Sequence, residues 1–255
     1  MNIEGKMSQR LITIAEMLRW EHPVATAADV GCDHGYVSIY LVQNNIADKA
    51  IAMDVRKGPL SGALSNIKGY GYEDRITTRL SDGLKELGEG EADALVIAGM
   101  GGGLMVRILS DCDINKLGIK KAVLQPQSEL CEFRRYIRGK GYSIVREQVV
   151  LEDGKYYFPM EIDFTDGSKD RSAECVAELM EKTGCDKECA ESLCDRFGES
   201  NILRKDALLR DFVSHGTTVN VSILKSLSRE EHPERYEQVA SENEENGRLL
   251  FYLNN

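Results

Sequence analysis

The sequence predicts an α/β protein in which a mostly parallel sheet carries helices on both faces, ends in an antiparallel hairpin and precedes a small helical domain. Three observations predict this fold. Short apolar runs alternate with helix-like segments up to residue 139, which indicates right-handed βαβ units. Asp153-Gly154 joins two strand-like runs, and this dipeptide is typical of tight hairpins. Beyond residue 168, apolar residues recur at helical spacing.

The elements of the α/β part follow from local patterns. Residues 8–20 place Leu11, Ile14 and Leu18 on one helical face after Ser8, a residue type that favours N-caps. Later strands are expected where apolar and β-branched residues form short runs. These expected strands are 25–31, 49–55, 75–79, 92–98, 121–124, 142–151 and 155–164. The helices expected between them are 36–43, 60–69, 102–109 and 129–139.

A change of pattern marks a second domain. Asp166-Gly167-Ser168 follows the last expected strand and has the composition of a linker. The apolar positions after it fit helices, with a polar, proline-containing break at 228–233. We therefore expect domains at 1–165 and 166–255, the second containing an antiparallel helical hairpin.

Composition excludes several classes of protein. With 255 residues, 42% hydrophobic and 29% charged, the chain is long enough for more than one domain and is not disordered throughout. It has no run near the ~18 apolar residues of a membrane span, and polar residues 1–10 do not match an export signal. Its seven cysteines are therefore expected to be reduced thiols in the cytoplasm. The spacing of Cys185, Cys189 and Cys194 fits no ordinary zinc site, so we expect no metal.

The charge is unevenly distributed. A net charge of −10 by itself argues against a nucleic-acid partner. Salt screens charges beyond about 8–10 Å, so a local basic patch can still bind a polyanion. The segment 116–146 contains eight basic and two acidic residues, although a solvated helix face would have the same composition. The candidates for contact with a polyanion are Lys116, Lys120, Lys121, Arg134, Arg135 and Arg138.

A glycine-containing turn follows the first expected strand. Gly31 and Gly35 allow a tight bend and close approach of a ligand to the backbone. The helix that begins at Tyr36 directs free N–H groups toward the same place. The second strand ends in Asp54, whose carboxylate is able to accept both hydroxyls of a ribose. Together these features indicate an adenosine-containing ligand.

The choice between NAD and S-adenosylmethionine depends on Asp33. A dinucleotide fingerprint needs glycine at that position, facing a pyrophosphate that would repel a carboxylate. A sulfonium and an ammonium group would instead attract it. Asp82, after the third strand, suits an adenine amino group, and the glycine-rich segment 99–103 leaves room beside a reactive methyl. These loops favour S-adenosylmethionine over NAD.

Five motifs carry a resemblance to a bacterial family. They are Asp29-Val-Gly-Cys-Asp33-His34-Gly-Tyr36, Ser81-Asp82-Gly83-Leu84, Ile97-Ala-Gly-Met-Gly-Gly102, Leu124-Gln-Pro126 and Glu152-Asp-Gly-Lys155. The chain resembles tRNA (adenine-22-N1)-methyltransferases over residues 7–163, and in outline in the helical tail. The resemblance implies a Rossmann-like, seven-stranded class I methyltransferase fold with a helical C-terminal domain, S-adenosylmethionine as cofactor and a tRNA D-arm adenine as target. The residues expected to bind the cofactor are Asp29, Gly31, Asp33, His34, Gly35, Asp54, Val55, Asp82, Gly83, Gly99, Met100 and Gly101.

The chemistry of the reaction assigns roles to Asp33, Tyr36 and His34. Adenine N1 carries an in-plane lone pair at neutral pH, so catalysis consists mainly of alignment and of stabilising the positive charge on the product ring. We expect Asp33 to stabilise that charge, Tyr36 to stack on or hydrogen-bond the base, and His34 to orient Asp33 or the donor. Asp29 either contacts the donor or only orients the turn. The segment 99–102 lacks the proline-aromatic loop of enzymes that methylate exocyclic amines, which favours a ring nitrogen.

Other functions stay open at this point. The chain could methylate another RNA or a small molecule, or serve as a scaffold that binds a protein through its helical tail. The basic segment and the retained acids Asp54 and Asp82 argue for a tRNA methyltransferase instead. We expect a cytoplasmic enzyme that acts on tRNA and is a monomer.

Overall fold

The computed structural model describes residues 2–255 and divides the chain into two units. The first unit is Met1–Asp170 and the second is Arg171–Asn255. The sequence placed the boundary after residue 165, but the short helix η2 (Gly167–Lys169) belongs to the first unit. Asp163 holds it there, because one of its oxygens accepts the Thr165 N–H at 2.9 Å and the other lies 2.7 Å from Lys169 Nζ.

Strand order determines where ligands can bind in the first unit. Among residues 2–255, its main sheet has seven strands in the order β3-β2-β1-β4-β5-β9-β6, with β9 antiparallel to both neighbours and the others parallel. The mostly parallel sheet is thus confirmed. Along the chain, β1 to β3 are added toward one edge of the sheet, and β4 and β5 toward the other. Ligands of such folds bind beyond the carboxyl ends of the strands at this switch point, between β1 and β4. The strands are β1 (Val24–Val30), β2 (Ala47–Asp54), β3 (Ile76–Leu80), β4 (Ala94–Met100), β5 (Lys121–Pro126), β6 (Ser143–Glu147) and β9 (Met160–Asp163).

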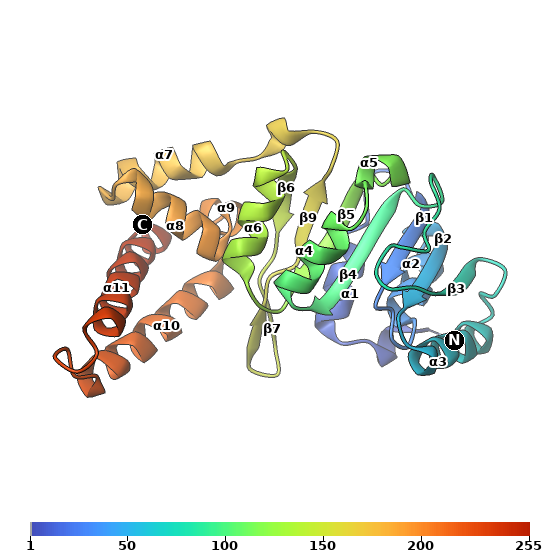
Figure 1. Cartoon of the computed structure of the whole chain (residues 1–255), viewed down its shortest axis with the longest axis horizontal. Helices are drawn as coiled ribbons and strands as arrows, with labels where there is room; N and C mark the ends of the chain where they lie inside the picture. The colour runs from blue at the N-terminus through green and yellow to red at the C-terminus, as the bar shows by residue number, and fades with distance from the viewer. Residues whose placement is uncertain (1) are drawn as a thin grey trace. The chain divides into compact units, whose positions relative to one another are not determined.

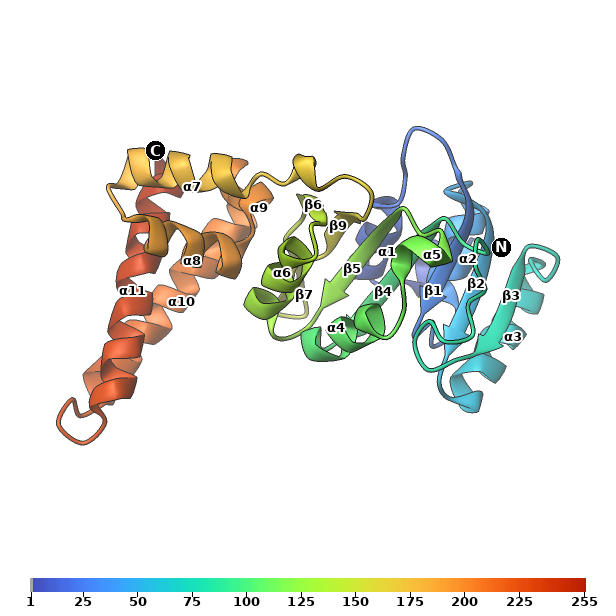
Figure 2. The same ribbon diagram turned by 45° about the horizontal axis from the view of Figure 1, so that its top comes forward.

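Helices cover both faces of this sheet (Figure 1). Figure 2 shows α4 and α6 on one face and α1 and α2 on the other. The central strands are nearly continuous apolar runs, as expected for strands buried on both faces, and residues 94–97 of β4 are fully buried. The helices of the first unit are η1 (Glu4–Lys6), α1 (Gln9–Glu16), α2 (Tyr36–Gln43), α3 (Lys57–Tyr70), α4 (Gly102–Ser110), α5 (Ile114–Leu117) and α6 (Leu130–Gly139).

The expected antiparallel hairpin is confirmed, but its two strands are interrupted. β6 pairs with β9 in the main sheet, whereas β7 (Val150–Glu152) and β8 (Lys155–Tyr157) form a separate two-stranded sheet around the Asp-Gly turn. Pro159 lies between β8 and β9, where its missing N–H removes no bond from either ladder. Its carbonyl accepts the Gln148 N–H at 3.0 Å and so joins the two chains at the break.

A buried ion pair joins α6 to β6. Arg134 Nε lies 3.0 Å from Glu147 Oε1, and Arg134 Nη2 lies 2.9 Å from Oε2, with both side chains fully buried. Such a bidentate pair satisfies two charges that would be costly to bury alone. It fixes the helix against the strand.

We expect Arg134→Ala to lower the free energy of unfolding by about 3 kcal/mol, because it removes the bidentate partner of the buried Glu147 carboxylate. Urea denaturation measures the change. Arg135→Ala, at an exposed position of the same helix, is the control and should cost about 0.5 kcal/mol or less. Arg134→Met/Glu147→Leu should be more stable than Arg134→Ala. If both variants lose the same stability, packing and not charge explains the effect.

The second unit is helical. The expected hairpin is formed by α10 and α11, which pack against each other on either side of the loop at residues 227–232. Asp206 caps α10 by accepting the N–H groups of Leu208 and Leu209 at 2.9 and 3.1 Å. Over residues 2–255, no helix is both long enough and apolar enough to cross a membrane. The helices of this unit are α7 (Ser172–Thr183), α8 (Lys187–Phe197), α9 (Glu199–Leu203), α10 (Ala207–Ser226) and α11 (Pro233–Asn254).

Candidate functional site

The turn after β1 has the backbone that the glycines were expected to permit. Gly31 has φ +77° and Gly35, the N-cap of α2, has φ +72°. A Cβ on Gly31 would require the terminal methyl of Met100 to move, and the positive φ strains any residue other than glycine there. Asp33 also has a positive φ, +47°, a conformation that aspartate and asparagine tolerate better than most residues. The turn therefore exposes its backbone and presents the Asp33 carboxylate.

The Asp29 side chain stabilises this turn through hydrogen bonds. It is buried, and its Oδ2 accepts the Ser38 N–H at 3.2 Å and the Ser38 hydroxyl at 2.7 Å. These bonds tie the first turn of α2 to the end of β1, which supports the orienting role. Burial raises the pKa of Asp29 to about 6, against the lowering effect of the bonds from Ser38.

The raised pKa of Asp29 makes stability depend on pH. The folded protein holds a proton on Asp29 up to about pH 6, whereas the unfolded chain releases it near the ordinary value, so stability falls as the pH rises between these values. Asp29→Asn removes the effect and keeps an acceptor for Ser38. The unfolding free energy of Asp29→Asn minus that of the wild type should increase by about 2–3 kcal/mol as the pH goes from about 4 to about 7. Urea denaturation at both pH values tests this, and a pH-independent difference would contradict it.

Asp54 stands at the carboxyl end of β2. Its side chain is 5% exposed, and Oδ1 accepts the backbone N–H of Arg56 at 2.8 Å. The neighbouring Val55 is 61% exposed, which is unusual for an apolar residue beside a buried acid. Both line the same cavity. This is the arrangement expected for a carboxylate that holds a ribose while an apolar side chain covers the attached base.

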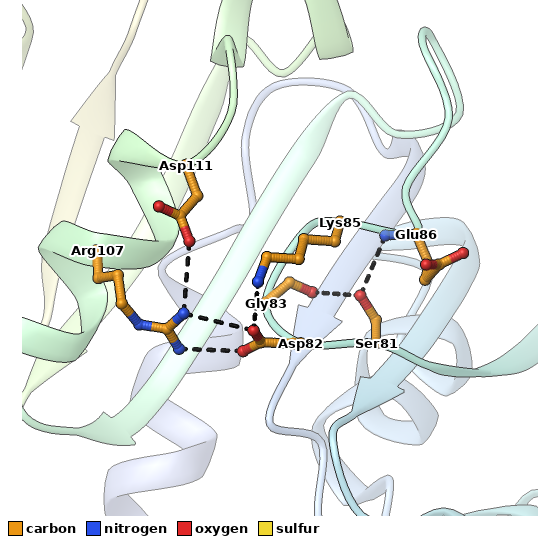
Figure 3. Close-up of polar contacts among 7 residues, drawn as sticks. All are labelled: Ser81, Asp82, Gly83, Lys85, Glu86, Arg107 and Asp111. Carbon is orange, nitrogen blue, oxygen red and sulfur yellow. Dashed lines mark hydrogen bonds and ion pairs between the residues drawn. The ribbon is translucent and has the colours of Figure 1, made fainter.

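Asp82 lies in a charged network in the loop after β3 (Figure 3). Its Oδ1 is 3.0 Å from Arg107 Nη2, and its Oδ2 is 2.5 Å from Lys85 Nζ and 3.4 Å from Arg107 Nη1. Arg107 and Lys85 hold the pKa of Asp82 down at about 2, so the carboxylate stays ionised. A carboxylate has about four acceptor sites. Since three are used here, room is left for one donor such as an adenine amino group.

The loop after β4 completes the site. Gly99 has φ +79°, and Gly101 is the N-cap of α4. Glu129 Oε2 accepts the Gly103 N–H at 2.9 Å and so caps α4, a contact that the sequence analysis missed. Because the methyl of Met100 lies against Gly31, the floor expected to be open is covered by a flexible side chain.

Two adjacent cavities bring the expected residues together. The larger, of about 260 Å³, is lined by residues from the ends of β1 to β4, and the smaller, of about 180 Å³, by the turn after β1 and by α1. Gly31, Asp33 and Ala98 belong to both walls. The larger cavity has the acids for a nucleoside and the glycines for close backbone approach, so these residues fit S-adenosylmethionine. The residues expected to bind the cofactor that line one or both of the two cavities are Asp29, Gly31, Asp33, His34, Asp54, Val55, Asp82, Gly83, Gly99 and Met100. Gly35 and Gly101 instead cap helices beside it.

The three expected catalytic residues line the smaller cavity. The Asp33 carboxylate lies 3.5 Å from His34 Nε2, and both side chains are more than half exposed. The rings of His34 and Tyr36 are stacked with centroids 5.6 Å apart. An aromatic surface and a carboxylate thus face the same space. This combination suits a base that becomes positively charged.

Arg10 completes the wall of the smaller cavity and was missed by the sequence analysis. Its Nη1 donates to Gln125 Oε1 at 2.6 Å, and its backbone N–H donates to Glu152 at 3.0 Å. The guanidinium lies 4.9 Å from the centroid of the Tyr157 ring. These partners are far away in the sequence, so helical periodicity gave no sign of them.

Part of the basic segment 116–146 lies away from the site, while Arg135 and Arg138, on α6, remain predicted phosphate contacts. Arg134 is fully buried against Glu147, so the expectation that it contacts a polyanion is wrong. Lys120 precedes β5 and Lys121 begins it, which places both at the amino edge of the sheet, opposite the site. Lys121 lies over the Trp20 ring at 4.8 Å, and Lys116 pairs with Glu89 at 2.8 Å.

Metal ligands are not assembled in the described part of the chain. Within residues 2–255, no three His, Cys, Asp or Glu side chains are grouped so that they could hold a metal ion.

The fold and the site define a class I, S-adenosylmethionine-type methyltransferase. Residues 7–160 match the family model described as "Methyltransferase domain", and the chain belongs to this family. It is 37% identical over 154 residues to the tRNA (adenine(22)-N(1))-methyltransferase of Bacillus subtilis (strain 168), an alignment that spans 60% of this chain and 63% of that protein. The resemblance drawn from the motifs is thereby confirmed.

Solved structures extend the likeness beyond the aligned sequence. The crystal structure of the B. subtilis M1A22 tRNA methyltransferase TrmK matches with a TM-score of 0.76 at 25% identity, covering 96% of this chain and 98% of that one. Sp1610 of Streptococcus pneumoniae, a putative tRNA (m1A22) methyltransferase in complex with S-adenosyl-L-methionine, matches with a TM-score of 0.75 at 25% identity, covering 96% and 99%. Because these matches cover 96% of this chain, they include most of the helical unit as well.

Proposed function

We propose that the chain transfers the methyl group of S-adenosylmethionine to N1 of adenine 22 in the D arm of tRNA. The observation that supports this most directly is the pair of adjacent cavities that share Gly31, Asp33 and Ala98. A donor in one and an adenine in the other would meet at this common wall. The relatives named above are described as enzymes of this activity.

The larger cavity would hold the donor nucleoside. Asp54 would accept the ribose hydroxyls, Val55 would cover the adenine, and Asp82 would accept its amino group. When bound, the donor supplies a methyl group on a positively charged sulfur, which keeps the C–S electron pair as the methyl leaves.

The smaller cavity would hold the target adenine. No residue has to remove a proton, because N1 of adenine already has a lone pair directed outward in the ring plane. Asp33 would stabilise the positive charge that the ring acquires, and Tyr36 would stack on it. His34, 3.5 Å from Asp33, would orient that carboxylate. A base enters such a pocket only after leaving its stack, at a cost of about a few kcal/mol.

The remaining expectations follow from this reaction. Methyl transfer from a sulfonium to a ring nitrogen needs neither a Lewis acid nor a second active site. We therefore propose a monomer that works without a metal ion, in the cytoplasm where its substrate is found.

Unmodified tRNA transcript with adenine at position 22 tests the proposal. Incubated with enzyme and S-adenosylmethionine, it should gain 1-methyladenosine, detected by nucleoside mass spectrometry and by a reverse-transcription stop at that position. A transcript with guanine at position 22 is the matched control and should gain none. N6-methyladenosine, or equal methylation of both transcripts, would refute the assignment.

A further inference from the structure

Two exposed cations beside the donor cavity come from the start of α3. Residues 55–58 directly follow the buried Asp54, and all four are exposed. They include Arg56 and Lys57, which we call the basic rim. The Arg56 side chain is 70% exposed and lines the larger cavity. The rim therefore lies at the carboxyl edge of the sheet, whereas Lys120 and Lys121 lie at the amino edge.

The two cations of the basic rim differ from the other cations near this cavity in the carboxylates that lie beside them. Lys85 and Arg107 are both paired with Asp82, and Arg107 also lies 3.4 Å from Asp111. Arg56 Nε lies 3.7 Å from Asp54 Oδ1, an oxygen that already accepts the Arg56 backbone N–H. For Lys57, the described residues 2–255 contain no ion-pair partner.

The charge of the whole chain makes such a local cationic surface important. A protein of net charge −10 repels RNA at long range. At physiological salt, screening limits this repulsion to about 8 Å, so cations that touch the RNA decide whether it binds. Arginine and lysine both bind phosphate, arginine with a bidentate geometry.

We propose that Arg56 and Lys57 bind backbone phosphates of the RNA that flank the target nucleotide. This inference rests on the proposed function. When S-adenosylmethionine fills the larger cavity and covers Val55, Arg56 and Lys57 lie at the edge of that cavity next to β2. The larger cavity shares its wall with the smaller one, so RNA that inserts a base there passes close to this border.

The test compares two double variants that remove the same charge. Arg56→Ala/Lys57→Ala neutralises the rim. Lys49→Ala/Lys68→Ala removes two exposed lysines from the amino end of β2 and the last turn of α3, at the opposite edge of the sheet. Fluorescence anisotropy with tRNA over a series of salt concentrations gives the affinity and its salt dependence. Calorimetry gives the dissociation constant of S-adenosylmethionine.

We expect the rim variant to bind tRNA about tenfold more weakly at physiological salt. The slope of log K against log salt should fall by about 1.5, because two phosphate contacts are lost. The Lys49→Ala/Lys68→Ala variant should keep the wild-type slope. Arg56→Lys/Lys57→Arg, which keeps both charges, should restore most of the slope. Lys57 does not line the donor cavity, so Lys57→Ala alone should lower the slope by about half as much without changing donor affinity.

Two results would overturn the inference separately from the proposed function. One is a wild-type enzyme that methylates tRNA while the rim variant and the Lys49→Ala/Lys68→Ala variant have equal slopes. The other is a rim variant whose only defect is weaker binding of S-adenosylmethionine, which would make Arg56 a donor contact. Failure of the wild type to methylate any tRNA would instead refute the proposed function, and this inference with it.

Discussion

Asp54→Ala is expected to weaken the binding of S-adenosylmethionine about 10³-fold. Asp54 is buried at the end of β2 and lines the larger cavity, where it would accept both ribose hydroxyls. Each hydrogen bond to a charged acceptor contributes about 1.5–3 kcal/mol, and two of them correspond to about three orders of magnitude in affinity. Isothermal titration calorimetry of the purified protein measures the change.

Asp48→Ala is the matched control, because Asp48 is an exposed aspartate near the other end of the same strand. It should bind the donor like the wild type. Asp54→Asn keeps one acceptor oxygen and should lose less affinity than Asp54→Ala. If Asp54→Ala binds S-adenosylmethionine as tightly as the wild type, Asp54 does not hold the ribose and the assignment of the larger cavity is wrong.

Asp33→Asn is expected to lower kcat by about 10²- to 10³-fold, the usual cost of removing a group that stabilises transition-state charge. Asparagine is the informative substitution, because residue 33 has φ +47° and asparagine adopts this conformation readily. Alanine would add backbone strain to the loss of charge. Single-turnover methylation of tRNA measures the rate, and calorimetry shows whether the donor still binds.

His34→Asn provides the comparison for Asp33. It removes the ring that lies 3.5 Å from the Asp33 carboxylate but keeps the charge, so we expect a loss of about tenfold or less. A different outcome is informative as well. If Asp33→Asn keeps kcat but raises the dissociation constant of S-adenosylmethionine, Asp33 binds the donor and does not stabilise the product.

The sequence predicted the features of the site that depend on local patterns. The turn at Gly31 and the acids Asp54 and Asp82 each follow directly from a strand, and parallel strands bring their carboxyl ends together. Contacts between distant segments could not be read in this way. Arg107 meets Asp82 across 25 residues, and Arg10 meets Gln125 across 115.

Composition alone did not specify where the charged residues lie. The segment 116–146 is basic, but β5 begins inside it, so its lysines lie at the edge of the sheet away from the site. Arg134 occupies an inward-facing position of α6, where the bidentate pair with Glu147 stabilises its charge. The hairpin was interrupted for a related reason, since Pro159 cannot donate to a ladder and the strands on either side of it join different sheets.

The contact of Arg10 with Glu152 has a consequence for synthesis of the protein. The two residues are 142 positions apart, yet the backbone N–H of Arg10, a residue in the wall of the smaller cavity, donates to Glu152. Ribosomes add about 5–20 residues per second, so the first helix waits about 7–30 s for this partner to be translated. By the end of that interval the nascent chain contains the strands that line the larger cavity, β1 to β4. The contact that holds Arg10 in the wall of the smaller cavity thus forms only after those strands have been translated.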